Sequence, residues 1–266
     1  MTTFYSQVLL GAPVNQILWF FLLYCFLGMI VEAVFFLVRE RVLESRVGLL
    51  YLPLRPLYGV GGVAYTLLLR PVLDHPVLLF LLGALVGTVV EYVAGALIDR
   101  AFGAVSWNYS DKVLNLNGLV CLQFSLAWGL LALFALYVLD GPLTRLVDLV
   151  TSSAGDRVLS VLMVLVLLSS ALTLAALGRV RRRVDALRAR PAGLAGTRAD
   201  VALTGLIDRL APDPVMINTF PRMSLLEELM ELTGTERVWL RLPRGPGSLP
   251  KPVEGHPLSA ISRPRE

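Results

Sequence analysis

Long apolar runs dominate this sequence. Before residue 180, four segments each contain roughly 17 or more mostly apolar residues, the length that a helix needs to cross the hydrocarbon core of a bilayer. The composition agrees, because 56% of the residues are hydrophobic and 17% are charged, against about 45–50% and 25% in soluble domains. We therefore expect an all-α, polytopic helical membrane bundle, which excludes a soluble enzyme.

The residues that hold metals, disulfides or nucleic acids are sparse. Cys25 and Cys121 are the only cysteines, and both lie inside apolar runs, so we expect packed thiols and no disulfide framework. His75 lies in a short turn and His256 near the C-terminus, which leaves no zinc motif. Basic residues flank the apolar runs and form no patch interleaved with aromatic residues, so nucleic-acid binding is not expected. We expect no cofactor and no metal ion.

The apolar runs predict five membrane helices, over residues 14–38, 57–73, 77–98, 117–139 and 158–178. No Lys or Arg precedes Arg39, whereas the 39–56 loop carries four arginines. Four more arginines follow the last apolar run, at Arg179 and Arg181–Arg183. Because cytoplasmic loops carry an excess of basic residues, this pattern predicts an outer N-terminus and a cytoplasmic C-terminus. The preference for arginine over lysine favours a GC-rich bacterial genome, and hence a bacterial inner membrane.

The sequence divides into a transmembrane domain, residues 1–180, and a basic cytoplasmic tail, residues 181–266. Within the tail, Ser224 begins a capping-box pattern, and an apolar stripe then runs to Gly234, which is typical of a short amphipathic helix. From about residue 243 the Pro, Gly and Arg content cannot build a core, so we expect disorder there.

The transmembrane domain contains a predicted internal repeat. When the chain is shifted by 59 residues, Gly28–Val34 aligns with Gly87–Val93. The repeat units cover residues 16–73 and 77–139, and the helix over 158–178 is extra. Each unit is an inward helix, a cytoplasmic loop and a returning helix, so a pseudo-two-fold axis along the membrane normal is expected.

Each repeat unit carries one intramembrane carboxylate, Glu32 or Glu91. A charged carboxylate at the centre of a span costs about 2.5–3.5 kcal/mol on insertion scales, so it rarely faces lipid. Glycines one turn away let helices approach closely, which favours an inward orientation of both carboxylates. Arg46 or Arg55 could reach them. The two carboxylates are then either structural Glu–Arg clamps or a polar site open to the cytoplasm.

The two cytoplasmic loops are more specific than simple connectors. The first, residues 46–59, is apolar and contains two prolines, which predicts a loop that packs against the bundle or re-enters it. The second contains aromatic residues that either anchor at the membrane interface or line a site, and asparagines that either cap a helix or bind a ligand. The candidate residues from both loops are Arg46, Tyr58, Trp107, Tyr109, Asn115 and Asn117.

These loops resemble one known family, the putative ABC-transporter type IV family of the CmpB type. The resemblance covers about residues 16–140 and rests on the motifs Pro53–Gly61, Trp107–Ser110, Asn115–Leu122 and Trp128-Gly129, together with Glu91. The chain departs from the family at Asn108, where the family has Asp, and at Leu119, where a basic residue is usual. The resemblance implies transport driven by a separate ATP-binding subunit, since the chain has no P-loop motif.

Three functions follow from these observations. The first is a transport subunit in which Glu32, Glu91 and Arg46 line a cytoplasm-facing substrate or ion site, and paired carboxylates there suit cation or proton coupling. The second is an integral-membrane enzyme that acts on a lipid-borne substrate by acid–base chemistry. The third is a non-catalytic scaffold or regulatory protein whose tail recruits partners. The transport subunit is favoured.

Overall fold

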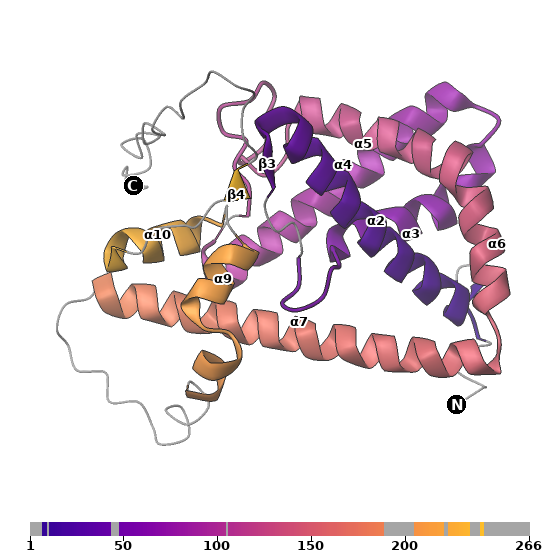
Figure 1. Cartoon of the computed structure of the whole chain (residues 1–266). Coiled ribbons are helices and arrows are strands. Elements are labelled where there is room, and N and C mark those ends of the chain that lie inside the picture. The colour runs from indigo at the N-terminus through magenta and orange to yellow at the C-terminus, as the bar shows by residue number, and fades with distance from the viewer. Residues whose placement is uncertain are drawn as a thin grey trace, which may run out of the picture.

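The computed structural model describes residues 7–9, 11–43, 48–104, 106–188, 205–220, 223–234 and 240–241. The fold is helical, and its core is built from the two helical hairpins α2–α3 and α4–α5 (Figure 1). Helices α2 and α4 are the long members, and α3 and α5 return along them. Their bounds are α2 Val14–Glu40, α3 Pro56–Leu68, α4 Pro76–Phe102 and α5 Leu122–Phe134.

The remaining elements surround this core. A 3-10 turn, η1, follows α3, and a π-helical segment, η2, continues α5 into α6 before the long helix α7. Residues 205–210 are also helical. Two short antiparallel ladders pair β1 with β2 and β3 with β4. The bounds are η1 Arg70–Val72, η2 Ala135–Leu139, α6 Asp140–Val150, α7 Ser153–Arg188, α9 Asp213–Thr219, α10 Ser224–Thr233, β1 Val8–Leu9, β2 Ala12–Pro13, β3 Val42–Leu43 and β4 Leu240–Arg241.

Four helical stretches of the described chain are long and apolar enough to cross a bilayer: Val14–Val38, Pro76–Phe102, Leu122–Val150 and Ser153–Arg188. The expected count of five is therefore not confirmed. The predicted span over 57–73 corresponds to α3, whose 13 residues reach only about 20 Å at 1.5 Å per residue. Residues 140–157, which lie between the predicted spans 117–139 and 158–178, contain α6, and the chain bends where α6 begins (Figure 1). The π segment and Pro142 account for this bend.

A turned loop, residues 48–55, and α3 follow β3 and pack against the bundle. The Leu50 amide donates to Thr173 Oγ1 at 3.0 Å, and the Arg55 amide donates to the Cys25 carbonyl, halfway along α2, at 3.0 Å. Helix α3 then runs antiparallel to α2, with Thr66 against Tyr24. Residues 48–55 therefore form a turned loop that packs against the bundle, as the sequence predicted, and the Gly48 amide closes it by donating to the Leu54 carbonyl at 2.8 Å before α3 begins.

Close packing of α2, α3, α4 and α5 depends on glycine. A Cβ added at Gly62 would lie 2.2 Å from Tyr24 Cγ, and one added at Gly83 would lie 2.3 Å from Ala132 Cβ. Such positions let two backbones approach where any side chain would hold them apart. The resulting core contains the buried aromatic residues Phe20, Tyr24, Tyr65 and Trp128.

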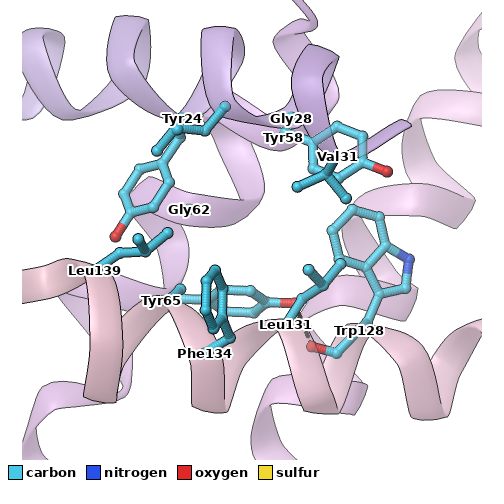
Figure 2. A pocket seen from close by; sticks show the side chains of 12 residues that line it. Tyr24, Gly28, Val31, Tyr58, Gly62, Tyr65, Trp128, Leu131, Phe134 and Leu139 are labelled. Atoms are coloured by element: carbon cyan, nitrogen blue, oxygen red, sulfur yellow. Dashed lines mark hydrogen bonds between the residues drawn. The ribbon is translucent and has the colours of Figure 1, made fainter. Parts of the chain in front are cut away.

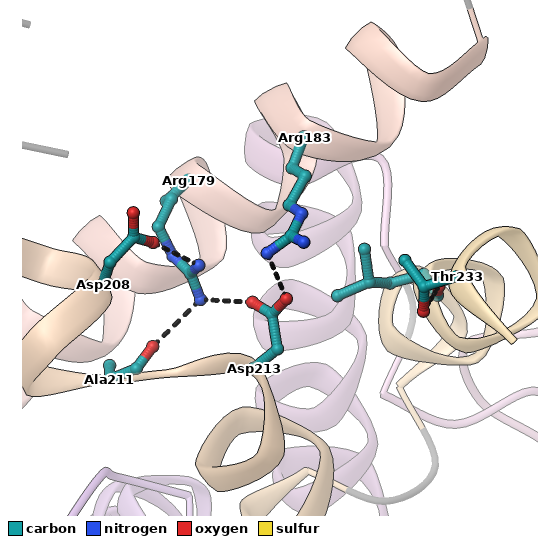
Figure 3. Close-up of polar contacts among 7 residues, drawn as sticks. Arg179, Arg183, Asp208, Ala211, Asp213 and Thr233 are labelled. Atoms are coloured by element: carbon teal, nitrogen blue, oxygen red, sulfur yellow. Dashed lines mark hydrogen bonds and ion pairs between the residues drawn. The ribbon is translucent and has the colours of Figure 1, made fainter. Parts of the chain in front are cut away.

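Residues 205–220 and 223–234 pack against the last turns of α7 and share a second hydrophobic core with Leu50 and Ala104. This docked tail is held by a charged cluster around Arg179, whose side chain is 4% exposed. Arg179 contacts Asp208 at 2.6 Å and Asp213 at 2.8 Å, and Arg183 also pairs with Asp213 (Figure 3). The expected helix before Gly234 is α10, which ends there in a left-handed turn (φ 67°) and begins after an N-cap at Met223 instead of Ser224. The division into domains at residue 180 stays a prediction, and the predicted disorder from residue 243 falls outside the described residues.

Candidate functional site

Glu91 lies on the buried face of α4. Gly83, Gly87, Glu91 and Gly95 recur every four residues on this face, and all four are buried. Glu91 is 4% exposed, so its carboxyl group lies among α4, α5 and the loop before α5. Burying a charged group without partners is costly, and the neighbours of Glu91 therefore determine what it can do.

Two hydrogen-bond donors hold the Glu91 carboxylate. Trp128 Nε1 donates to Oε2 at 2.9 Å, and the Tyr109 hydroxyl donates to Oε1 at 3.1 Å. Burial, with a smaller contribution from the Glu91 charge, raises the pKa of Tyr109, which keeps its hydroxyl protonated and able to donate. Within the described residues, no Lys or Arg forms an ion pair with Glu91. The carboxylate is thus hydrogen-bonded, and none of the described basic side chains neutralises its charge.

The second carboxylate, Glu32, is paired. Arg55 Nε lies 2.7 Å from Glu32 Oε1, and the two side chains are 20% and 14% exposed. Arg55 reaches this position because its backbone amide binds the Cys25 carbonyl and Pro56 begins α3 directly after it. The fixed φ of Pro56 suits the first turn of a helix.

The two carboxylates belong to one cluster. Trp128 connects Glu91 to the Glu32 side of the cluster, because its N–H donates to Glu91 and its ring packs on Tyr58. The Tyr58 side chain, on the first turn of α3, interacts with Glu32, and its ring centroid lies 5.2 Å from that of Trp128. We call this cluster the carboxylate site, and its members are Glu32, Arg55, Tyr58, Glu91, Tyr109 and Trp128.

Backbone geometry in the 103–121 loop places Tyr109. Asn117 and Gly118 adopt left-handed conformations (φ 55° and 70°), which turn the chain so that the Gly118 carbonyl accepts from the Tyr109 amide at 2.8 Å. The Tyr109 ring then stacks on Phe124, with centroids 4.6 Å apart. A Cβ at Gly118 would lie 2.7 Å from Ser110 Oγ, so this turn has no room for a side chain.

The structure brings together four of the eight candidate residues, namely Glu32, Tyr58, Glu91 and Tyr109. Three others serve the loop. Trp107 donates to the Leu119 carbonyl at 2.7 Å, Asn115 binds three backbone groups of residues 110–118, and Asn117 donates to the Tyr92 hydroxyl at 3.0 Å. Arg46 lies outside the described residues.

Sequence reasoning did not select Arg55 or Trp128 as site residues. The sequence offered Arg55 only as one of two basic residues that could reach the carboxylates. Its position in the Pro53–Gly61 motif was the signal that could have identified it. Trp128 was visible only as part of the Trp128-Gly129 motif, because an apolar helix gives no sign that one indole faces a carboxylate. In the described part of the chain, no group of three or more His, Cys, Asp or Glu side chains is placed to hold a metal ion.

A cavity of about 50 Å³ adjoins the carboxylate site between α2, α3 and the α5–η2 helix (Figure 2). Tyr58 and Trp128 belong to both the cavity wall and the carboxylate site. The rest of the wall is apolar or aromatic and includes Tyr24, Val31, Tyr65, Phe134, Ala135 and Leu139.

Comparison with known proteins identifies the family. Residues 19–174 match the family model described as "Putative ABC-transporter type IV". This match contains the whole carboxylate site, extends beyond the motifs through α6 into α7, and ends before the docked tail. No curated protein and no solved structure matches the chain. Since the match covers more than half of the sequence, the chain belongs to the putative ABC-transporter type IV family and is a multi-pass membrane protein of the ABC-transporter type.

Proposed function

We propose that the chain is the membrane-spanning, permease-like subunit of a transporter and that the carboxylate site is where it binds its substrate or a coupled ion. The observation that carries this proposal is the Glu91 carboxylate, which is 4% exposed, accepts two hydrogen bonds and has no basic partner among the described residues. A structural clamp would be expected to neutralise such a charge, as Arg55 does for Glu32. A cation or a proton could supply the missing charge at Glu91.

The orientation that fits this proposal places the docked tail in the cytoplasm of a bacterial cell and the N-terminus outside. Arg179, Arg181, Arg183 and Arg188 all lie at the tail end of α7, in agreement with the excess of basic residues in cytoplasmic segments. The 48–55 and 106–121 segments then approach the site from the cytoplasmic side. The predicted duplication of residues 16–73 and 77–139 would explain why both hairpins carry a carboxylate.

The chain supplies no ATP-hydrolysing motif, so this function requires a separate ATP-binding subunit. We expect native mass spectrometry of the full chain, extracted gently from the cells in which it occurs, to detect a stoichiometric ATP-binding protein. A stronger detergent should release that protein and provides the control for specific association. A chain that is recovered alone, or with lipid only, would count against the transport assignment.

A further inference from the structure

The cavity beside the carboxylate site has an unusually aromatic wall. Five of its lining residues are aromatic, and they come from three different helical segments (Figure 2). The five are Tyr24, Tyr58, Tyr65, Phe134 and Trp128.

The polar atoms of this wall are engaged elsewhere. The Tyr24 hydroxyl bonds to Thr66 at 3.3 Å, and the Tyr65 hydroxyl bonds to the Gly83 and Trp128 carbonyls at 3.2 and 3.1 Å. The Trp128 N–H donates to Glu91. The wall therefore presents aromatic rings and aliphatic groups to the cavity. Such a surface accommodates alkyl chains and, through the ring faces, cations.

The cavity reaches faces of α2 and α5 that a bilayer would cover. Val31 and Phe134 line it and are 36% and 46% exposed. A molecule dissolved in the bilayer would thus have a lateral route between these helices. The π segment η2 contributes Ala135 and Leu139 to the wall, and π segments within helices occur frequently at functional sites.

The ligand class follows from the size of the cavity and the charge beside it. An apolar cavity of about 150 Å³ in a protein core binds benzene, so a cavity of about 50 Å³ suits only a short stretch of alkyl chain. On the far side of the Trp128 ring system, Glu91 offers a carboxylate without a basic partner among the described residues. Apolar space and an available negative charge are thus separated by a single side chain.

We propose that this site binds a lipophilic cation, of which a short stretch of the alkyl chain occupies the aromatic-walled cavity and the positively charged nitrogen is attracted to Glu91 beside Tyr58 and Trp128. The inference rests on the proposed transport function and names its substrate class. Two sources have this chemistry, a free alkylamine or alkylammonium ion and the amine headgroup of a membrane lipid.

The test measures binding of radiolabelled decyltrimethylammonium and of neutral decanol to the full chain in phosphatidylglycerol nanodiscs. We expect saturable binding of the cation at one site per chain. Glu91→Gln should weaken binding of the cation about tenfold or more, equivalent to about 1.4 kcal/mol, and should leave decanol binding unchanged. Val31→Trp should fill the cavity mouth and weaken binding of both compounds. Val34→Trp, on the same helix at a position that is 51% exposed and does not line the cavity, should change neither.

Nonsaturable binding of the cation, or equal binding to Glu91→Gln and the unchanged chain, would overturn the inference. Neither result touches the association with an ATP-binding subunit, which is measured separately, so the inference and the transport assignment fail independently. Addition of phosphatidylethanolamine to the nanodiscs identifies the source. Competition with decyltrimethylammonium supports a lipid amine, and saturable binding without competition supports a free lipophilic cation.

Discussion

Gly87→Ala will force α4 and α5 apart and strongly destabilise the bundle. The added Cβ would lie 2.5 Å from both Cβ and Cγ of Trp128 and 2.6 Å from the Tyr65 hydroxyl oxygen. Trp128 cannot move away without losing its hydrogen bond to Glu91, and Tyr65 is fixed by two carbonyl groups. Neither neighbour can therefore give way cheaply.

Overpacking of this kind costs about 3 kcal/mol, which for a chain of this size lowers Tm by roughly 5–10 °C. The measurement is thermal unfolding in nanodiscs, and its readout is the fraction of the protein that remains monodisperse after heating. Gly178→Ala on α7 is the matched control, because its added Cβ would have only Phe102 Cε1 at 3.9 Å. Alanine also favours a helix over glycine, so the control should be neutral or more stable. Equal stability of the two variants would contradict the close α4–α5 contact.

Arg179→Met will release the docked tail from α7. The Arg179 guanidinium binds Asp208, Asp213 and the Ala211 carbonyl, and it is buried beneath residues 205–213. Removal of one partner from a buried ionic cluster is strongly destabilising, at a cost of about 3 kcal/mol. Asp208 is 50% exposed and can be solvated, whereas Asp213 is 19% exposed and, among the described residues, keeps only its ion pair with Arg183.

The measurement is hydrogen exchange of the α10 backbone amides. A loss of about 3 kcal/mol in the free energy that holds the docked tail on α7 should accelerate this exchange roughly 100-fold, for amides that exchange through opening of the tail. Arg188→Met is the control on the same helix. Arg188 pairs with Glu228 but is 55% exposed, so its removal should cost no more than about 1 kcal/mol. If both variants exchange at the same rate, Arg179 does not hold the tail.

The apolar runs predicted the long helices well. Helix α2 begins at Val14 as expected, and α4 and α7 each contain the predicted run. Helix α7 extends ten residues past the predicted end at 178, because its final turns carry arginines that a membrane-span criterion excludes. Those arginines were interpreted only as a sign of orientation. Their pairing with Asp208, Asp213 and Glu228 depends on tertiary contacts that no local pattern encodes.

The half-length helix α3 shows where hydropathy is insufficient. Residues 57–73 are apolar enough for a span, yet helix α3 covers only Pro56–Leu68, and the turned loop of residues 48–55 packs against the bundle before it. Hydropathy measures transfer into lipid and cannot separate a helix from a protein-covered loop. The prolines and apolar residues of that loop did predict its packing against the bundle.

The sequence predicted only part of the candidate site, because it does not show which helix faces meet. Intramembrane carboxylates are costly wherever they lie, so Glu32 and Glu91 were visible in the sequence. Their partners depend on which faces of α3 and α5 meet α2 and α4. Arg55 and Trp128 therefore became recognisable only from the structure.

ATP hydrolysis by the native complex in nanodiscs, with and without Glu91→Gln, tests the proposed transport site most directly. We expect the variant to retain its ATP-binding subunit and to lose about tenfold or more in ATP turnover, a barrier change of about 1.4 kcal/mol. Asp140→Asn, which alters the ion pair with Arg70 at the other end of the bundle, should keep the full rate. A fully active Glu91→Gln complex would contradict the account, because the buried carboxylate would then have no part in transport.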